Sequence, residues 1–272
     1  MLPFSHLNDY EFFDILESTE KNIKRKLKDT NFYDFIKSRN LVSETLTSNF
    51  KYFNTDEYCS TINKHNINNV IWHQNIRSLD KHFGHLAAYI NLLKEPSFTC
   101  LTEIGRKNIE NRKAQLKKLG YDMEFEKPQK ARGGVAIICK QGFDLEPRND
   151  LKMKKTLNTN ILDFENIWYE TFIPGIGPTV IAVIYKHPNS TIAGLKAFKN
   201  ILQESLEKIN KEKKCCILLG DINIDGMKII KNEVRDFFEM TLENNFYLLS
   251  VCLLEYRRTP VQLSTTSSST QR

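Results

Sequence analysis

The sequence lacks several features that would assign a chain to a class at once. No two of its six cysteines form a CxxC pair, which argues against a zinc site. No apolar run approaches the ~20 residues of a membrane-spanning helix, and the first residues lack the basic start and apolar core of a secretory signal. Four of the cysteines sit in apolar runs, where cysteine is usually a small buried hydrophobe. These absences predict an intracellular protein without a membrane partner, in either the nucleus or the cytoplasm.

The length of 272 residues suits one large α/β domain with an extension. Residues 1–65 have amphipathic, helix-like spacing and no motif of chemical interest, so we expect a helical N-terminal extension. Residues 66–255 alternate between strand-like and helix-like patterns and form the predicted domain. Residues 256–272 include a Ser/Thr run of low complexity, which predicts a disordered tail.

Charge is unevenly distributed along the chain. Residues 70–272 hold 30 Lys and Arg against 23 Asp and Glu, whereas residues 1–69 hold 9 against 10. A basic domain suits a polyanionic partner such as nucleic acid. The excess is moderate for a segment of this length, so charge alone is weak support for that partner.

Apolar runs of strand length alternate with apolar residues at helical spacing from Val70 onward. The Pro- and Gly-rich turn at 174–178 indicates an antiparallel hairpin between the strands on either side of it. Hairpins together with helical crossovers predict a mixed sheet rather than a purely parallel one. Strands are predicted near residues 70–72, 98–101, 135–139, 166–173, 179–185 and 215–219, and helices near 79–93, 109–119, 195–209 and 234–242.

The most informative segment is 217–223, ILLGDIN, in which an apolar strand ends on Gly220 and is followed by Asp221 and Asn223. The ends of strands are where α/β proteins place their chemistry. Three further strands are followed by polar side chains in the same way, in HQNIRSL (73–79), LTE (101–103) and IYKHPNS (184–190). Taken alone, Asp221 and Asn223 could equally form a simple turn.

The polar side chains at these strand ends suit metal-assisted phosphodiester hydrolysis. Glu103 and Asn75 offer the hard oxygen ligands that Mg²⁺ prefers, with Mn²⁺ as a second candidate. Asp221 is a candidate to orient or deprotonate the attacking water. Asn75, Asn223 and Tyr185 are candidates to donate hydrogen bonds to phosphoryl oxygens. On its own, Glu103 would be interpreted as a solvated loop residue, and Tyr185 as half-buried core.

Other polar residues of these segments have weaker assignments. Arg77, Lys186 and His187 are candidate phosphate contacts, but a solvated charge at the rim is an equally good interpretation. His73 lies inside its strand and is interpreted as packed behind the site. Gly133-Gly134 is interpreted as a strand entry and not as a phosphate loop, because no helix follows it directly.

The motifs, in this order, resemble the endonuclease domain of non-LTR retrotransposons, which are apurinic-endonuclease-like members of the endonuclease/exonuclease/phosphatase superfamily. HQNIRSL at 73–79 is similar to their H-x-N-I-R-S-L, and LTE at 101–103 to their L-T-E-T, whose Glu is the metal ligand. RGGVAI at 132–137 resembles R-G-G-V-A-I. VIYKHPNS at 183–190 resembles V-Y-R-P-P-N-S, and LGDINID at 219–225 resembles G-D-F-N-I-D.

This resemblance implies a two-sheet α/β sandwich of the endonuclease/exonuclease/phosphatase (DNase I-like) type over residues 66–255, with its last strands missing. The implied activity is Mg²⁺-dependent nicking of DNA for retrotransposon integration. The implied partners are DNA and a reverse transcriptase domain in the parent element. Two alternatives stay open: a non-catalytic remnant that retains nucleic-acid affinity, and a phosphoesterase of the same superfamily that acts on another phosphate substrate.

The sequence departs from the family pattern at several positions. His187 stands at or near an Arg or Pro of the family, and Ile104-Gly105 replaces Thr-Trp. Two further family segments, an I-D-H-I strand and an S-D-H that supplies an Asp–His pair, are not found, and His187 is the last histidine of the chain. Because groups that act as a unit lose activity together, we expect little or no nuclease activity from the chain.

Overall fold

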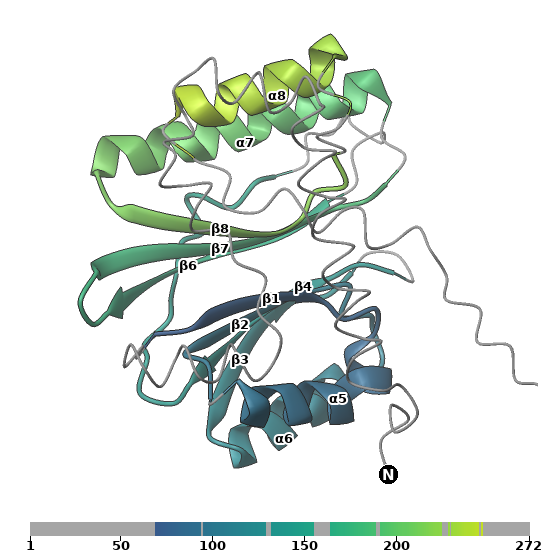
Figure 1. Cartoon of the computed structure of the whole chain (residues 1–272), viewed down its shortest axis with the longest axis vertical. Helices are drawn as coiled ribbons and strands as arrows, with labels where there is room; N and C mark the ends of the chain where they lie inside the picture. Colours follow the sequence, from purple (N-terminus) through teal and green to yellow (C-terminus); the bar gives the residue numbers. More distant parts are fainter. Residues whose placement is uncertain are drawn as a thin grey trace, which may run out of the picture.

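Two four-stranded β-sheets pack face to face, and helices cover the outer face of each sheet (Figure 1). The predicted fold class, a two-sheet α/β sandwich, is confirmed. The predicted extension over 1–65 and the predicted tail over 256–272 lie outside the described residues. Of the helices in the described part, none has both the length and the apolar content that a bilayer crossing needs. The computed structural model of the chain describes residues 69–93, 95–128, 132–154, 164–188, 191–224, 228, 230–244 and 246.

The first half of the described chain forms sheet A and its two helices: β1 (Ile71–Asn75), α5 (Leu79–Leu92), β2 (Phe98–Thr102), α6 (Ile109–Lys118), β3 (Tyr121–Glu126) and β4 (Val135–Lys140). The strand order is β1-β2-β4-β3. β1 and β2 run parallel and are joined through α5, whereas β4 pairs antiparallel with β2 and with β3. α5 begins after Ser78, whose side chain accepts a hydrogen bond from the Lys81 N–H and so satisfies one unpaired donor of the helix.

The second half forms sheet B and its two helices: β5 (Glu146–Pro147), β6 (Phe164–Ile173), β7 (Gly177–Lys186), α7 (Ile192–Glu212), β8 (Cys215–Asp221) and α8 (Asn232–Glu243). The strand order is β5-β6-β7-β8. β6 and β7 form the antiparallel hairpin that the turn at 174–178 predicts, and α7 connects the parallel strands β7 and β8. Each sheet therefore has a parallel pair with a helical crossover at one edge.

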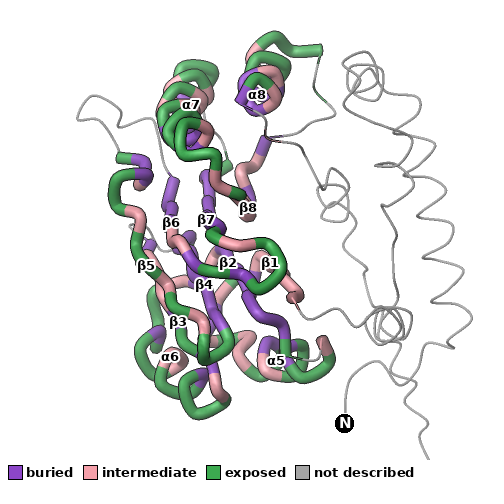
Figure 2. Tube along the Cα trace, turned by 90° about the vertical axis from the view of Figure 1, so that its left-hand side faces the viewer, coloured by how far each residue is buried: buried purple, intermediate pink, exposed green. Residues whose placement is uncertain are grey.

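Three apolar clusters hold these layers together: one under α5 and α6, one between the sheets and one under α7 and α8. β4 shows why its sequence is continuously apolar. Ala136 and Ile138 pack toward the first helix layer, whereas Val135 and Ile137 pack between the sheets. Both faces of the strand are buried, as the buried segments inside the sandwich in Figure 2 show, so alternation with polar residues is absent.

Two strands have no counterpart in the sequence analysis. β3 lies at an edge of sheet A, where Tyr121 and Met123 are buried and the intervening Asp122 is exposed. The six residues YDMEFE alternate strictly between apolar and charged side chains, which is the pattern of a half-buried strand, so a signal for β3 was present and was missed. β5 has two residues and exists through its pairing with β6.

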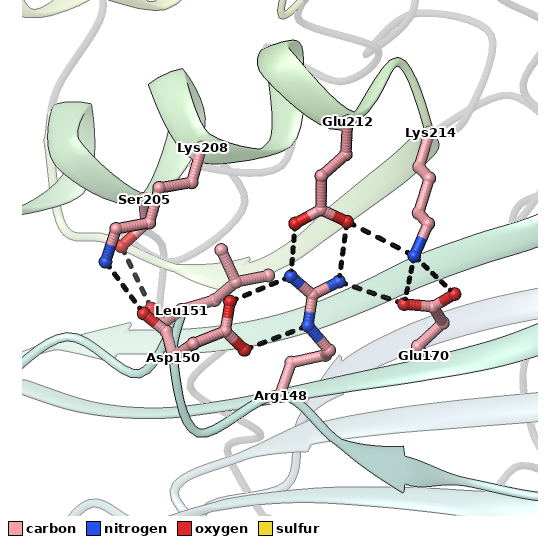
Figure 3. A network of polar contacts seen from close by, with 8 residues as sticks. All are labelled: Arg148, Asp150, Leu151, Glu170, Ser205, Lys208, Glu212 and Lys214. Carbon is pink, nitrogen blue, oxygen red and sulfur yellow. Dashed lines mark hydrogen bonds and ion pairs between the residues drawn. The ribbon is translucent and has the colours of Figure 1, made fainter.

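One cluster of polar side chains connects sheet B to the C-terminal end of α7 through hydrogen bonds and ion pairs (Figure 3). Arg148, directly after β5, donates hydrogen bonds to the carboxylates of Asp150, Glu170 and Glu212. Lys214 donates to Glu170 and forms an ion pair with Glu212. The hydrogen bonds from Arg148 lower the pKa of Asp150 and of Glu212. These five residues are called the Arg148 network below.

Candidate active site

The two parallel strand pairs bring their C-terminal ends to one place. Asn75 is the last residue of β1, and Glu103 follows the last residue of β2. Tyr185 is next to last in β7, and Asp221 is the last residue of β8. In register, Asn75 is paired with the residue before Glu103, and Tyr185 is directly opposite Asp221. The strand register therefore places Asn75 next to Glu103 in sheet A and Tyr185 next to Asp221 in sheet B.

A single amide then joins the two pairs across the sandwich. Asn75 Nδ2 donates to Glu103 Oε1 at 2.7 Å and to Asp221 Oδ2 at 2.9 Å. The Tyr185 hydroxyl donates to the same Glu103 oxygen at 3.2 Å. Because both carboxylates bind one nitrogen, they lie within a few ångströms of each other. Asn75, Glu103, Tyr185 and Asp221 are called the site cluster below.

The backbone around the site cluster adopts conformations that most side chains avoid. Glu103 has a φ of 56°, Asn223 of 49° and Arg77 of 54°, all in the left-handed region. This region costs roughly 1–2 kcal/mol for a residue with a side chain, and such strain gathers at functional sites. Arg77 itself is exposed on the surface. The strain thus falls on the turns that present the predicted site residues.

Gly220 is required by the close approach of two strands. Its φ is 144°, and a Cβ atom added there would lie 1.9 Å from the carbonyl oxygen of Ile184 in the neighbouring β7. No side chain fits at that distance from a backbone atom. Packing therefore explains the glycine of the GDIN motif. Gly220 lets β8 approach β7 closely at the residue before Asp221.

Burial changes the ionisation of two side chains at this place. It raises the pKa of the Tyr185 hydroxyl, and the nearby Glu103 carboxylate raises that pKa further, so the phenol is protonated at neutral pH. For Lys186, burial lowers the pKa to about 8, against an opposing effect of the Asp221 carboxylate. Lys186 is only 2% exposed, and its Nζ donates to the His187 carbonyl. It is therefore not the solvated rim charge that the sequence analysis considered.

The other predicted residues surround the site cluster. Asn223 donates its backbone N–H to Asp221 Oδ1 at 3.3 Å and its side-chain Nδ2 to the Lys186 carbonyl at 2.7 Å. It therefore holds the turn after β8 against the end of β7. The His187 ring packs edge-on against the Tyr185 ring, with centroids 4.7 Å apart. The structure joins four predicted residues by hydrogen bonds, places Asn223 and His187 beside them, and buries Lys186.

Sequence reasoning missed Glu165. This residue lies on β6 directly opposite Tyr185, is 3% exposed, and has its Oε1 atom 3.3 Å from His187 Nε2. It lies one residue before the strand predicted at 166–173, and its strand also contains Asn166, Glu170 and Thr171, so no sequence signal set it apart. Buried polar side chains normally have partners. Asn166 has them, since it bonds the backbone of Met153 and the Trp168 ring nitrogen.

The site cluster fits a hard divalent cation. Asn75 Oδ1 is buried and has no hydrogen-bond partner in the described part of the chain. Glu103 supplies a carboxylate beside it, and Mg²⁺ sites in proteins use one or two carboxylates, with water and substrate phosphate as the other ligands. Among the described residues, no three His, Cys, Asp or Glu side chains gather as a metal-binding group. The donors available here are oxygen atoms, which suit Mg²⁺ better than a softer metal.

No protein-family model and no curated protein matches this chain. Among solved structures, an AP endonuclease from Archaeoglobus fulgidus is similar at 18% identity and a TM-score of 0.45, over 64% of this chain and 69% of that one. A 3′-5′ exonuclease (NExo) from Neisseria meningitidis is similar at 16% identity and a TM-score of 0.42, over 64% and 70%. ANGEL2, a 2′,3′-cyclic phosphatase, is similar at 16% identity and a TM-score of 0.43, over 59% and 55%. These likenesses, at low identity, concern the fold alone.

Proposed function

We propose that this chain is a weakly active, metal-dependent phosphodiesterase that nicks DNA. The observation that supports this most strongly is the site cluster, in which one amide holds a carboxylate from each sheet. Two carboxylates held this close repel each other. A bound cation with a phosphate group would relieve that repulsion.

Glu103 and the Oδ1 atom of Asn75 would hold the metal ion, Mg²⁺ or Mn²⁺. When bound, such an ion neutralises charge that develops on the phosphoryl group and the leaving oxygen. The amide oxygen of Asn75 supports this assignment, because a buried acceptor without a partner costs about 1–3 kcal/mol, which a cation offsets.

Asp221 orients the attacking water and accepts one of its protons. The water oxygen bonds to phosphorus while one ester P–O bond breaks, and the released oxygen takes up a proton from solvent. Asn223 holds Asp221 Oδ1 through its backbone N–H and so keeps the carboxylate in place for this step. Tyr185, protonated at neutral pH, donates a hydrogen bond to Glu103 and fixes that side chain.

DNA is the proposed substrate for two reasons. Residues 70–272 have an excess of basic over acidic side chains, which suits a polyanion. The segments that form the site cluster are also those that resemble the endonuclease domain of non-LTR retrotransposons. In that setting the nick would start reverse transcription, and the parent element would also encode a reverse transcriptase domain.

The decisive experiment is nicking of supercoiled plasmid by the full chain in Mg²⁺, compared with Asp221→Ala. We expect the substitution to lower the rate on the order of 10³-fold. Asp122→Ala, which removes an exposed carboxylate from β3, is the matched control and should nick like the parent chain. Equal nicking by the parent chain and Asp221→Ala would refute the proposal. Hydrolysis of small phosphate esters without nicking would assign the site to another phosphate substrate.

Metal binding gives a readout that does not depend on turnover. Mn²⁺ bound to the chain can be measured by electron paramagnetic resonance, and Mg²⁺ should displace it. Glu103→Gln should weaken Mn²⁺ binding at least tenfold, because it removes the carboxylate ligand. Unchanged Mn²⁺ affinity in this variant would show that the metal does not bind at Glu103.

A further inference from the structure

A buried carboxylate–imidazole pair lies directly beside the site cluster. Glu165 on β6 and His187 after β7 approach each other with Oε1 and Nε2 3.3 Å apart. The Glu165 side chain is 2% exposed and the His187 side chain 14%. The carboxylate is therefore inside the protein, while part of the imidazole reaches the surface.

The burial of the Glu165 carboxylate is costly, because a buried polar atom needs a partner. Its Oε2 atom is buried and has no hydrogen-bond partner among the described residues. A buried carboxylate is tolerated when a hydrogen-bonding partner lies beside it, and the His187 ring is that partner for Glu165.

Glu165 and His187 contact residues that also position the site cluster. A Cβ atom at Gly133 would lie 2.9 Å from Glu165 Oε2 and 2.9 Å from His187 Nε2, so the glycine backbone covers the pair closely. The Gly133 carbonyl accepts a hydrogen bond from the Gly105 N–H at 3.0 Å, two residues after Glu103. On its other side, the His187 ring contacts Tyr185. The same few residues therefore position Glu103, Tyr185 and His187.

We propose that His187 is a further catalytic residue of this phosphodiesterase, donating a hydrogen bond to a phosphoryl oxygen, and that Glu165 is the positioning residue that holds the ring. This rests on the proposed function. The contact stabilises charge that builds on the phosphoryl group during hydrolysis. The acid–imidazole pair is formed by β6 and by the residue that follows β7.

Nicking rates of single and double variants test whether Glu165 acts through His187. His187→Gln should lower kcat on the order of 10²-fold, the usual loss for one donor to a developing oxyanion, and Glu165→Gln should lower it less. The double variant should be no slower than His187→Gln alone, because the carboxylate acts only through the ring. Additive losses, or a kcat for His187→Gln equal to that of the parent chain, would overturn the proposal. Thermal unfolding of each variant shows whether it is folded.

Chemical rescue separates a catalytic ring from a structural one. Imidazole added to His187→Ala should restore nicking several-fold, because the free ring enters the space beside Glu165. It should not accelerate Asp221→Ala or the parent chain. If His187→Ala is folded and imidazole does not raise its rate, the ring has no part in the chemistry. This test holds even when Glu165→Gln fails to fold.

A phosphate titration keeps the test independent of turnover. The ring proton signals of the six histidines can be followed by NMR in Mg²⁺, with His187→Gln identifying the signal of interest. Added inorganic phosphate should shift the His187 signal, and the shift should be lost in Glu103→Gln. An unshifted His187 signal overturns the proposal. A parent chain that never nicks DNA but shows this shift would refute the DNA-nicking function and still support the phosphate contact.

Discussion

The site cluster and the Arg148 network are both groups of carboxylates joined by hydrogen bonds, but they are bridged by different donors. In the Arg148 network a guanidinium donates to three carboxylates, and a lysine joins two of them. In the site cluster the two carboxylates share the neutral amide of Asn75, and one of them also accepts from a neutral phenol. Negative charge is therefore matched by direct cationic donors in the first group and bridged by neutral donors in the second.

We propose from this difference that the Arg148 network serves stability and the site cluster serves a ligand. Pairing with Arg148 lowers the pKa of Asp150 and Glu212, so the folded state favours their charged forms. In the site cluster, by contrast, burial and Glu103 raise the pKa of Tyr185. The Tyr185 phenol therefore stays neutral and can donate a hydrogen bond to Glu103. The four predictions below test this contrast, from the largest expected effect to the smallest.

The largest effect should come from Glu103→Gln. We expect nicking to fall on the order of 10³-fold, since the carboxylate is the proposed metal ligand. The free energy of unfolding should stay the same or rise, because one of two neighbouring negative charges is removed. Plasmid nicking and urea unfolding measure the two effects. Glu124→Gln, on β3 of the same sheet, is the matched control. A clear loss of stability in Glu103→Gln would show that the site cluster is also a stabilising network.

The next largest effect should come from Gly220→Ala, which tests the packing that presents Asp221. The added methyl group would lie 1.9 Å from the Ile184 carbonyl oxygen, so β8 must shift. We expect a loss of about 3 kcal/mol in the free energy of unfolding together with reduced nicking. Gly142→Ala is the control, because its φ is also positive, at 105°, but nothing lies within 4 Å of the added atom. Similar losses in the two variants would mean that the close approach to β7 is unimportant.

Arg148→Met should have the opposite profile to Glu103→Gln. The variant leaves three carboxylates without their shared donor, and the Arg148 side chain is only 14% exposed. We expect a loss of about 1–2 kcal/mol in the free energy of unfolding, moderated by solvent around the partners, and nicking within twofold of the parent chain. Lys140→Met, which breaks an exposed pair with Glu95, should cost less. A large fall in nicking by folded Arg148→Met would show that the Arg148 network also supports the activity of the site cluster.

The sequence analysis could predict the strand ends because long apolar runs show where buried strands stop. β4 is apolar throughout because both faces are buried, and the motif after β8 follows directly from its last apolar residue. The link through Asn75 could not be predicted, since it depends on the distance between two sheets. The Glu165–His187 pair depends on the register of the β6–β7 hairpin, which sets Glu165 opposite Tyr185. Periodicity within one strand holds no information about either contact.

The smallest effect concerns the pH dependence of stability. The pKa values of Asp150 and Glu212 are lowered in the folded state by Arg148. Their contribution is therefore present above the pKa of the unfolded chain, at about pH 4, and is lost as the pH falls through the folded value. The difference in unfolding free energy between the parent chain and Arg148→Met should be constant near pH 6–7 and shrink below about pH 4. Urea unfolding at a series of pH values measures it. A gap that widens on acidification would contradict the assigned pairing, because protonated carboxyls cannot form ion pairs with Arg148.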